Sequence, residues 1–381
     1  MFRFLRIAAL FLFASVAPAI AEHSSVYIVV DLGSGKVIAH SGAGKLWQPA
    51  SVTKLMTSYV AFKAMKSGQM TPESRVVVTK NALKEPPSKM GYRVGTDMTL
   101  DNALKMLIVR SANDIAVAIA ETVGGNEAKF ISLMNAEAKR LGMTSTRYFN
   151  PNGLPDDRQV TTARDIAVLA RALWLEFPEF RQYFKIPAIR VGKKILRSHN
   201  KLLERFRGAN GMKTGFICAS GFNMVATATR RGKTVAVVVL GANSAKERAE
   251  IAARLLRDGF KRRTFGTRPA LATFRSARAL GPAPNLRPEI CTKKKKKKQN
   301  PMLAKGRSAL IPRFVLMDPV RVTTGVAKTK QPSAGPAVTV PIPPRRPTMP
   351  GDETATLLGL ETLAQLRDEN GDPLLSVFAE P

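Results

Sequence analysis

The chain has few of the residues that usually hold metals or redox centres. Among its 381 residues there are only two cysteines, Cys218 and Cys291, and three histidines, His23, His40 and His199. The histidines are scattered along the chain, and neither HExxH nor CxxC occurs. We therefore expect no metal and no cofactor.

Long hydrophobic runs are also missing, apart from one at the N-terminus. Residues 1–21 carry Arg3 and Arg6 near their start, continue as an apolar stretch and end in Ala19-Ile20-Ala21. This order is typical of a secretory signal peptide, and the apolar stretch is shorter than the roughly 20 residues that span a bilayer. We expect cleavage before Glu22 and an exported, non-spanning protein in the periplasm or cell envelope.

Export bears on the two cysteines, because disulfides persist in oxidising compartments. One interpretation is a disulfide between Cys218 and Cys291. The other is a buried thiol at Cys218 and an exposed thiol at Cys291. The sequence leaves both open.

Charge divides the chain, whose formal net charge is +32. Residues 261–350 hold 21 Lys and Arg against 2 Asp and Glu, and they include the run Lys293–Lys298. One charge sign, many prolines and few aromatics are typical of disorder. We expect a folded domain over 22–263 and a mostly disordered basic tail over 264–350. Residues 351–381 are acidic, and their leucines are spaced for a short helix.

Strand-like segments lie at both ends of the folded region. The segment SVYIVVDLGSGKVIAH predicts two strands joined by a turn at Gly33-Ser34-Gly35, and GFNMVATATR and KTVAVVVLGAN predict two more. Helical periodicity dominates residues 51–175, and a closing helix is expected over 244–260. We predict an α+β domain whose antiparallel sheet is formed from both ends, with a helical region inserted.

A serine and a lysine lie three residues apart in WQPASVTKLMTSYV, at Ser51 and Lys54. On a helix they share one face with Ser58, and the apolar neighbours face a core. A neutral lysine one turn from a serine can take its proton and make it a nucleophile. Free lysine has a pKa of about 10.4, so burial and a second cation must lower it. The helix N-terminus would stabilise negative charge developing near Ser51.

Two further segments supply polar groups of the right kind. Ser111-Ala112-Asn113 places a hydroxyl and an amide at a helix boundary, and Lys213-Thr214-Gly215 begins the strand-rich section. A strand edge there can align an extended peptide, the glycine permits close approach, and Lys213 is the candidate second cation. Each motif alone recurs by chance. Their order, with spacings of 60 and 102 residues from Ser51 to Ser111 to Lys213, makes the combination specific.

From about residue 26 to 262 the chain resembles the serine D-alanyl-D-alanine carboxypeptidases, the low-molecular-mass penicillin-binding proteins. The resemblance rests on PASVTKLMTSYV, SANDIAVAIAE, TTARDIAVLARAL, GMKTGF, SGFNMVATATR and the arginine in GANSAKERAE, in that order. It implies a penicillin-binding, β-lactamase-like transpeptidase fold. It also implies removal of the terminal D-alanine from peptidoglycan stem pentapeptides, with β-lactams as covalent inhibitors.

The resemblance also implies a role for each matching residue. Ser51 would be the acylated nucleophile and Lys54 its general base, while Ser111 and Asn113 would relay the proton and hold the substrate amide. The terminal carboxylate would bind to Lys213 and Thr214 of the KTG motif, which Gly215 completes, with help from Arg248. The backbone N–H groups of Ser51 and Phe216 would form the oxyanion hole.

Two departures from the family pattern affect these expectations. The residue after KTG is often histidine in the family, and here it is Phe216, which keeps the backbone donor but not an imidazole side chain. A β-rich second domain ending in an amphipathic membrane helix is common in the family and is not found in this sequence. The basic tail either replaces that anchor by attraction to an anionic membrane or envelope surface, or is only a solubilising extension.

Other function classes are weaker interpretations. A class A β-lactamase needs a glutamate that activates water, and NPNGLPDDRQVTT offers only Asp156 and Asp157. A non-catalytic wall-binding or scaffold protein would not need the reacting residue types, which are all present. A nucleic-acid partner is suggested by charge alone, and export argues against it.

Overall fold

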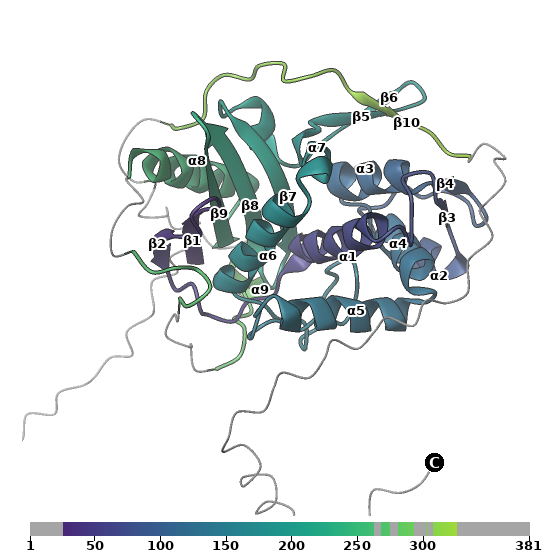
Figure 1. Cartoon of the computed structure of the whole chain (residues 1–381), viewed down its shortest axis with the longest axis horizontal. Helices are drawn as coiled ribbons and strands as arrows, with labels where there is room; N and C mark the ends of the chain where they lie inside the picture. Colours follow the sequence, from purple (N-terminus) through teal and green to yellow (C-terminus); the bar gives the residue numbers. More distant parts are fainter. Residues whose placement is uncertain (1–25, 263–267, 275–280, 293–302, 304–307, 326–381) are drawn as a thin grey trace, which may run out of the picture. The chain divides into compact units, whose positions relative to one another are not determined.

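The structure is a computed structural model that describes residues 26–262, 268–274, 281–292, 303 and 308–325 (Figure 1). The predicted signal peptide, residues 1–21, and the predicted acidic segment, residues 351–381, lie outside the described residues. Within the described ranges, no helix is both long and apolar enough to cross a membrane.

A five-stranded antiparallel sheet organises the domain (Figure 1). The central strand β9 pairs with β1 on one side, with Ile28 opposite Val238, and with β8 on the other. The valine-rich run of β9 suits this position, because a strand covered on both faces needs apolar residues throughout. In spatial order the strands are β2 (Val37–Ser41), β1 (Val26–Asp31), β9 (Lys233–Ala242), β8 (Gly221–Arg230) and β7 (Ala209–Ile217).

Helices occupy most of the chain between β2 and β7, and one long helix follows β9. The Thr162 hydroxyl accepts the N–H of Asp165 at 3.1 Å and caps α6. The α-helices are α1 (Lys54–Lys66), α2 (Lys80–Lys84), α3 (Leu100–Arg110), α4 (Asn113–Gly124), α5 (Glu127–Arg140), α6 (Ala163–Glu176), α7 (Gln182–Lys185), α8 (Ala245–Lys261) and α9 (Arg287–Ile290). The short 3-10 helices are η1 (Ala50–Thr53), η2 (Pro178–Phe180) and η3 (Lys201–Glu204).

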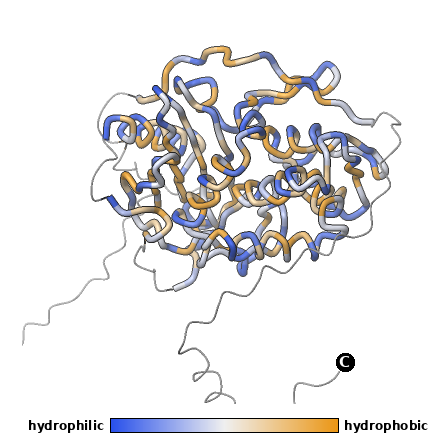
Figure 2. Tube along the Cα trace, viewed as in Figure 1, coloured by the Kyte–Doolittle hydropathy of each residue, from blue (hydrophilic) through white to orange (hydrophobic). Residues whose placement is uncertain are grey.

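Helices cover both faces of the sheet, so the predicted α+β fold, with a helical region inserted between strands from both ends, is confirmed. Ile251 and Leu256 of α8 belong to the core on one face. On the other face, Ile28 and Val238 belong to the larger core that includes α1 and α6. The outer helix α5 buries only one side, and its tube alternates between hydrophobic and hydrophilic residues in Figure 2.

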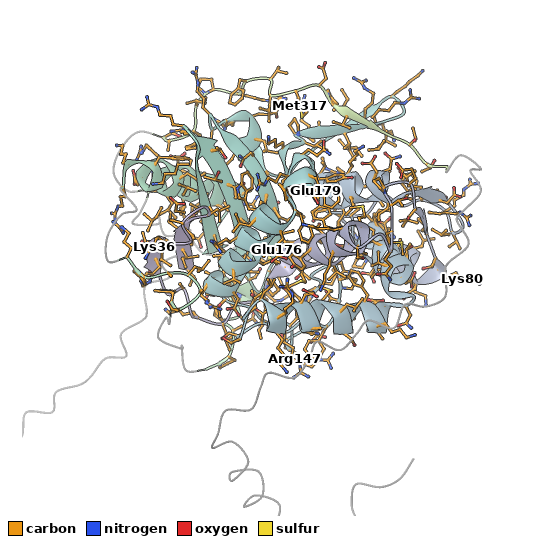
Figure 3. The ribbon with its side chains drawn as sticks, in the orientation of Figure 1. Lys36, Lys80, Arg147, Glu176, Glu179 and Met317 are labelled. Carbon is orange, nitrogen blue, oxygen red and sulfur yellow. A yellow bond between two sulfur atoms is a disulfide. The ribbon has the colours of Figure 1, made fainter. Side chains whose placement is uncertain are left out.

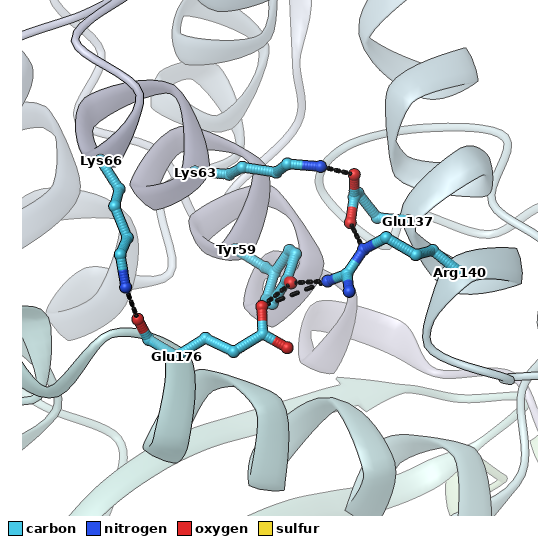
Figure 4. A network of polar contacts seen from close by, with 6 residues as sticks. All are labelled: Tyr59, Lys63, Lys66, Glu137, Arg140 and Glu176. Atoms are coloured by element: carbon cyan, nitrogen blue, oxygen red, sulfur yellow. Dashed lines mark hydrogen bonds and ion pairs between the residues drawn. The ribbon is translucent and has the colours of Figure 1, made fainter. Parts of the chain in front are cut away.

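Helix α1 is buried on nearly every side, and a polar network fixes its C-terminal half (Figure 4). The Tyr59 hydroxyl hydrogen-bonds to Glu176 on α6, and Lys66 donates to the Glu176 carbonyl at 2.6 Å. Burial and Glu176 raise the pKa of Tyr59, so the phenol stays protonated. The network therefore anchors α1 to its neighbours α5 and α6. Its members are Tyr59, Lys63, Lys66, Glu137, Arg140 and Glu176.

Two small sheets complete the fold. One is antiparallel and pairs β3 (Arg75–Val77) with β4 (Asp97–Thr99). The other has the order β10-β5-β6, with β5 (Ala188–Val191) antiparallel to β6 (Lys194–Arg197) and parallel to β10 (Val320–Val322). Strand β6 leads directly into His199 and η3.

Strand β10 belongs to residues 308–325, which we call the C-terminal strap. The strap lies across the surface of the domain, along the upper edge of Figure 1. At its start the N–H of Ala309 donates to Glu250 on α8 at 2.6 Å. At its end the N–H of Gly325 donates to the Asp97 carbonyl on β4 at 2.7 Å. The strap thus joins elements that are far apart in the sequence.

The sequence predicts a mostly disordered tail over 264–350, and within that range residues 268–274, 281–292 and 308–325 have defined positions on the domain. These segments are rich in proline, but specific tertiary contacts hold them on the domain. A disulfide joins Cys218, after β7, to Cys291, with the Cα atoms 5.8 Å apart. Contacts between segments that are remote in the sequence cannot be predicted from local composition. Apart from residue 303, the other residues of the predicted tail lie outside the described ranges.

Candidate active site

Ser51 lies in η1, at the turn that leads into α1, and two glycines let other segments approach this turn closely. A Cβ atom at Gly153 would stand 1.9 Å from the Ala50 carbonyl oxygen, so only glycine fits there. A Cβ atom at Gly215 would stand 3.0 Å from the Ser51 amide nitrogen. The backbone around Ser51 therefore packs closely between the 150–157 loop and strand β7.

Lys54 is fully buried, and its amine makes three polar contacts. Its Nζ atom lies 2.7 Å from Asn113 Oδ1, 2.5 Å from the Asn152 carbonyl oxygen and 3.1 Å from Ser51 Oγ. The first two partners can only accept. A neutral amine would donate its two protons to them and direct its lone pair to the serine hydroxyl.

The surroundings favour that neutral form. Burial, followed by the charge of Lys213, lowers the pKa of Lys54 well below its usual value, and the charges of Glu85 and Asp114 oppose this in part. This agrees with the sequence argument that a buried lysine base needs a second cation nearby. The pair Ser51–Lys54 thus has the geometry of a nucleophile and its base.

Ser111 and Asn113 lie where α3 passes into α4. Ser111 adopts a left-handed conformation with φ of +60°, which turns the chain sharply between the two helices. Asn113 donates from Nδ2 to the Pro86 carbonyl at 2.8 Å, while its Oδ1 accepts from Lys54. Both residues line the same cleft as Ser51.

The loop after α2 forms a wall of this cleft, and sequence reasoning missed its importance. The buried carboxylate of Asp114 accepts the N–H groups of Met90 and Gly91 and so fixes the loop. Asn152 donates from Nδ2 to Glu85 at 2.8 Å. Burial, followed by the charge of Glu127, raises the pKa of Glu85. These residues hold in place the segments that contact Lys54.

Strand β7 brings the KTG residues to the opposite side of the cleft, at the edge of the sheet. Lys213 is 2% exposed and donates to the Thr214 carbonyl at 3.1 Å. Arg248 of α8 is buried behind it and donates to the carbonyls of Gly215 and Asn223, each at 3.2 Å. Burial and Arg248 lower the pKa of Lys213 to about 7, and burial lowers that of Arg248 to about 10.

Within the described ranges, neither of these two cations pairs with a carboxylate. Buried charges without a counter-ion are costly. A carboxylate-bearing ligand in the cleft would relieve that cost. The arrangement is therefore suited to an anionic ligand beside Ser51.

The cleft has a volume of about 370 Å³, and its outer rim is aromatic. Phe216 is 43% exposed and stacks on Phe222 with the ring centroids 4.2 Å apart. His199 also lines the cleft. Loss of solvent, followed by the charges of Lys213 and Arg110, lowers the pKa of His199 to about 4, so its ring is neutral near pH 7.

The structure thus brings the nine predicted site residues to one place. Seven line the cleft and two, Lys54 and Lys213, are buried beneath its surface. The seven are Ser51, Ser111, Asn113, Thr214, Gly215, Phe216 and Arg248. Sequence reasoning considered His199 only as a metal ligand. In the part of the chain that the structure describes, no group of three metal-binding side chains occurs.

An antiparallel sheet interrupted by helices, with a serine–lysine pair leading into a buried helix, defines the penicillin-binding type of fold. The chain belongs to the D-alanyl-D-alanine carboxypeptidase family, whose sequence model matches residues 13–244. It is 35% identical over 266 residues to D-alanyl-D-alanine carboxypeptidase DacC of Escherichia coli, a match that covers 66% of each protein. The chain thus spans just under two thirds of that relative's length.

Solved structures agree with this assignment. Penicillin binding protein 6B from Escherichia coli superposes with a TM-score of 0.59 at 32% identity, over 66% of this chain and 81% of that one. Penicillin-binding protein D2 from Listeria monocytogenes, in its cefotaxime-bound form, superposes with a TM-score of 0.57 at 28% identity. That match covers 62% of this chain and 97% of the other.

Proposed function

We propose that the protein is a serine D-alanyl-D-alanine carboxypeptidase that removes the terminal D-alanine from peptidoglycan stem pentapeptides. The observation that carries the proposal is the Lys54 amine, which faces two carbonyl acceptors and the Ser51 hydroxyl while burial and Lys213 favour its neutral form. Family membership supports the same reaction and substrate class.

These positions support the following reaction. Ser51 Oγ attacks the carbonyl carbon of the terminal peptide bond as its proton passes to Lys54 Nζ. The oxyanion is stabilised by the backbone N–H groups of Ser51 and Phe216. The proton then passes by way of Ser111 to the departing D-alanine nitrogen, and the C–N bond breaks to leave an ester on Ser51. Water, deprotonated by Lys54, hydrolyses that ester and restores the serine.

The cleft would also select the substrate. The C-terminal carboxylate would lie against Thr214 and the buried charge of Lys213, with Arg248 reinforcing the positive potential. The penultimate residue would extend along the open edge of β7, where main-chain groups can pair with a peptide. Asn113 would hold the substrate amide. A need for a terminal carboxylate favours a carboxypeptidase over an endopeptidase.

The decisive experiment combines a fluorescent penicillin with a small peptide ending in D-Ala–D-Ala. Wild-type protein should form a covalent adduct on Ser51 and release D-alanine, and Ser51→Ala should do neither while keeping its melting temperature. An adduct on Ser111, or one that persists in Ser51→Ala, would refute the assignment. Adduct formation without peptide hydrolysis would indicate a non-catalytic binding protein, and rapid penicillin turnover a β-lactamase.

We also infer how the chain is divided and where it acts. Residues 1–21 would direct export, residues 22–263 would form the main catalytic unit, and the enzyme would work in the periplasm or cell envelope. The run Lys293–Lys298, outside the described residues, would attract anionic membrane or envelope polymers at about 1 kcal/mol per charge. Replacing that run with serine should weaken salt-sensitive binding to isolated envelope. Unchanged binding would leave the run as a solubilising segment.

A further inference from the structure

The small sheet β10-β5-β6 has one buried and one exposed face. Ile189, Leu196 and Val322 point inward, and Ile189 and Val322 are almost completely buried. The register places Arg190 beside Arg321 on one side and beside Ile195 on the other. All three of these side chains are exposed and lie on the outward face.

This outward face concentrates positive charge. Like charges directly opposite one another on neighbouring strands are destabilising, yet Arg190 and Arg321 are neighbours in register. None of the ion pairs among the described residues involves either of them. Lys193 in the hairpin turn is also exposed, whereas Arg197, on the same face opposite Ala188, pairs with Glu204 at 3.4 Å. The face is complementary to a polyanion.

Exposed apolar side chains accompany these cations. Ile195 is 43% exposed although its strand neighbour is an arginine. In the strap, just before β10, Val315, Leu316 and Met317 are 78%, 38% and 43% exposed. Met317 lies at the upper edge of the molecule in Figure 3, beside this sheet. Cations interspersed with exposed apolar groups are typical of surfaces that enter the headgroup region of a bilayer.

We propose that the outward face of β10-β5-β6, with the strap residues 315–317, docks on a bilayer that contains anionic phospholipid. A soluble polyanion would satisfy the arginines but would leave the apolar side chains in water, whereas a bilayer satisfies both. The surface belongs to the folded domain and is distinct from the run Lys293–Lys298. It borders the cleft, because His199 follows two residues after Arg197.

The test is co-flotation of the mature full-length protein with vesicles of phosphatidylglycerol and phosphatidylcholine. Each removed cation should weaken binding about fivefold, so Arg190→Ser with Arg321→Ser should weaken it about 25-fold. The matched control is Lys129→Ser with Lys139→Ser on α5, at the opposite edge of Figure 1. These two lysines are exposed and, like the arginines, take part in none of the ion pairs. The control should bind like the wild type.

A second matched pair tests the apolar contribution. Ile195→Ser should weaken binding about three- to tenfold, whereas Leu133→Ser on α5, which is also 43% exposed, should not. The proposal would be overturned if the β-sheet variants and the α5 variants lost vesicle binding equally, or if neither lost any. Binding that depends on the arginines but not on Ile195, and that polyglutamate displaces, would also overturn it and indicate a soluble polyanion. Hydrolysis of a small peptide and the melting temperature should not change in any variant, which separates this test from that of the proposed function.

Discussion

Replacing Gly215 with alanine should impair acylation while the protein stays folded. The added Cβ atom would stand 3.0 Å from three backbone atoms, the Pro49 carbonyl oxygen and the amide nitrogens of Ser51 and Val52. Contacts this short require the backbone of β7 or η1 to move by a few tenths of an ångström. One of those amides, that of Ser51, is a proposed oxyanion donor. The displacement therefore falls on the donor itself.

The magnitude follows from the size of that shift. Loss of a whole oxyanion donor costs about 10²–10³-fold in kcat, and a misplacement of about 1 Å costs about 10²-fold. A shift of tenths of an ångström should therefore slow acylation about 10- to 10²-fold, or about 1.4–2.7 kcal/mol. The assay is the second-order rate constant for labelling by a fluorescent penicillin, measured beside the melting temperature.

Gly232→Ala is the matched control. Gly232 lies in the β8–β9 turn with φ of +75°, and a Cβ atom there meets nothing within 4 Å. Its substitution strains the backbone and should lower the melting temperature without changing the labelling rate. If Gly215→Ala protein is labelled within about twofold of the wild-type rate, the close approach of β7 to Ser51 does not matter for acylation and the reasoning is wrong.

Two further predictions concern charge and covalent structure. Acylation needs neutral Lys54, so its rate should fall as pH drops through the Lys54 pKa. Lys213→Met removes a nearby cation, so the pKa of Lys54 should rise and the fall in acylation rate should occur at higher pH. If rapid-quench labelling gives the same pH midpoint for this variant and the wild type, the proposed effect of Lys213 on the pKa of Lys54 is contradicted. Because the pKa of Lys213 is about 7, KM for a peptide with a free carboxylate should rise as pH increases above that value. Finally, Cys291→Ser opens the Cys218–Cys291 link, whose sequence separation is 73 residues. It should lower the free energy of unfolding by about 2–4 kcal/mol in urea titrations, and equal midpoints with equal slopes would show that the link adds no stability.

The sequence predicted those parts of the site that lie in regular elements. Helical spacing puts Ser51 and Lys54 on one face, and the structure has them 3.1 Å apart. The strand after residue 209 carries Lys213 at a sheet edge, as its position in the sequence indicated. Local periodicity is enough for such residues, because the backbone geometry of a single element fixes where they point.

The rest depends on which remote segments meet, and no local pattern encodes that. Nothing in NPNGLPDDRQVTT indicated that the Asn152 carbonyl accepts from Lys54 or that Gly153 is needed beside Ala50. His199 gave no signal, because its place in the cleft depends on how the β5–β6 hairpin packs. Strand β10 has only three residues in a proline-rich region, and only its pairing with β5 makes it a strand.

The C-terminal strap affects when the domain can finish folding. Strand β5 is made before most of the large sheet, yet its outer edge stays unpaired until residues 320–322 arrive. Pairing between such distant segments is slow, because a long loop must close before the contact forms. Until then the open edge can pair with another chain. A chain that ends at residue 263 would keep this edge exposed permanently, so the catalytic residues could all be present in a protein prone to self-association.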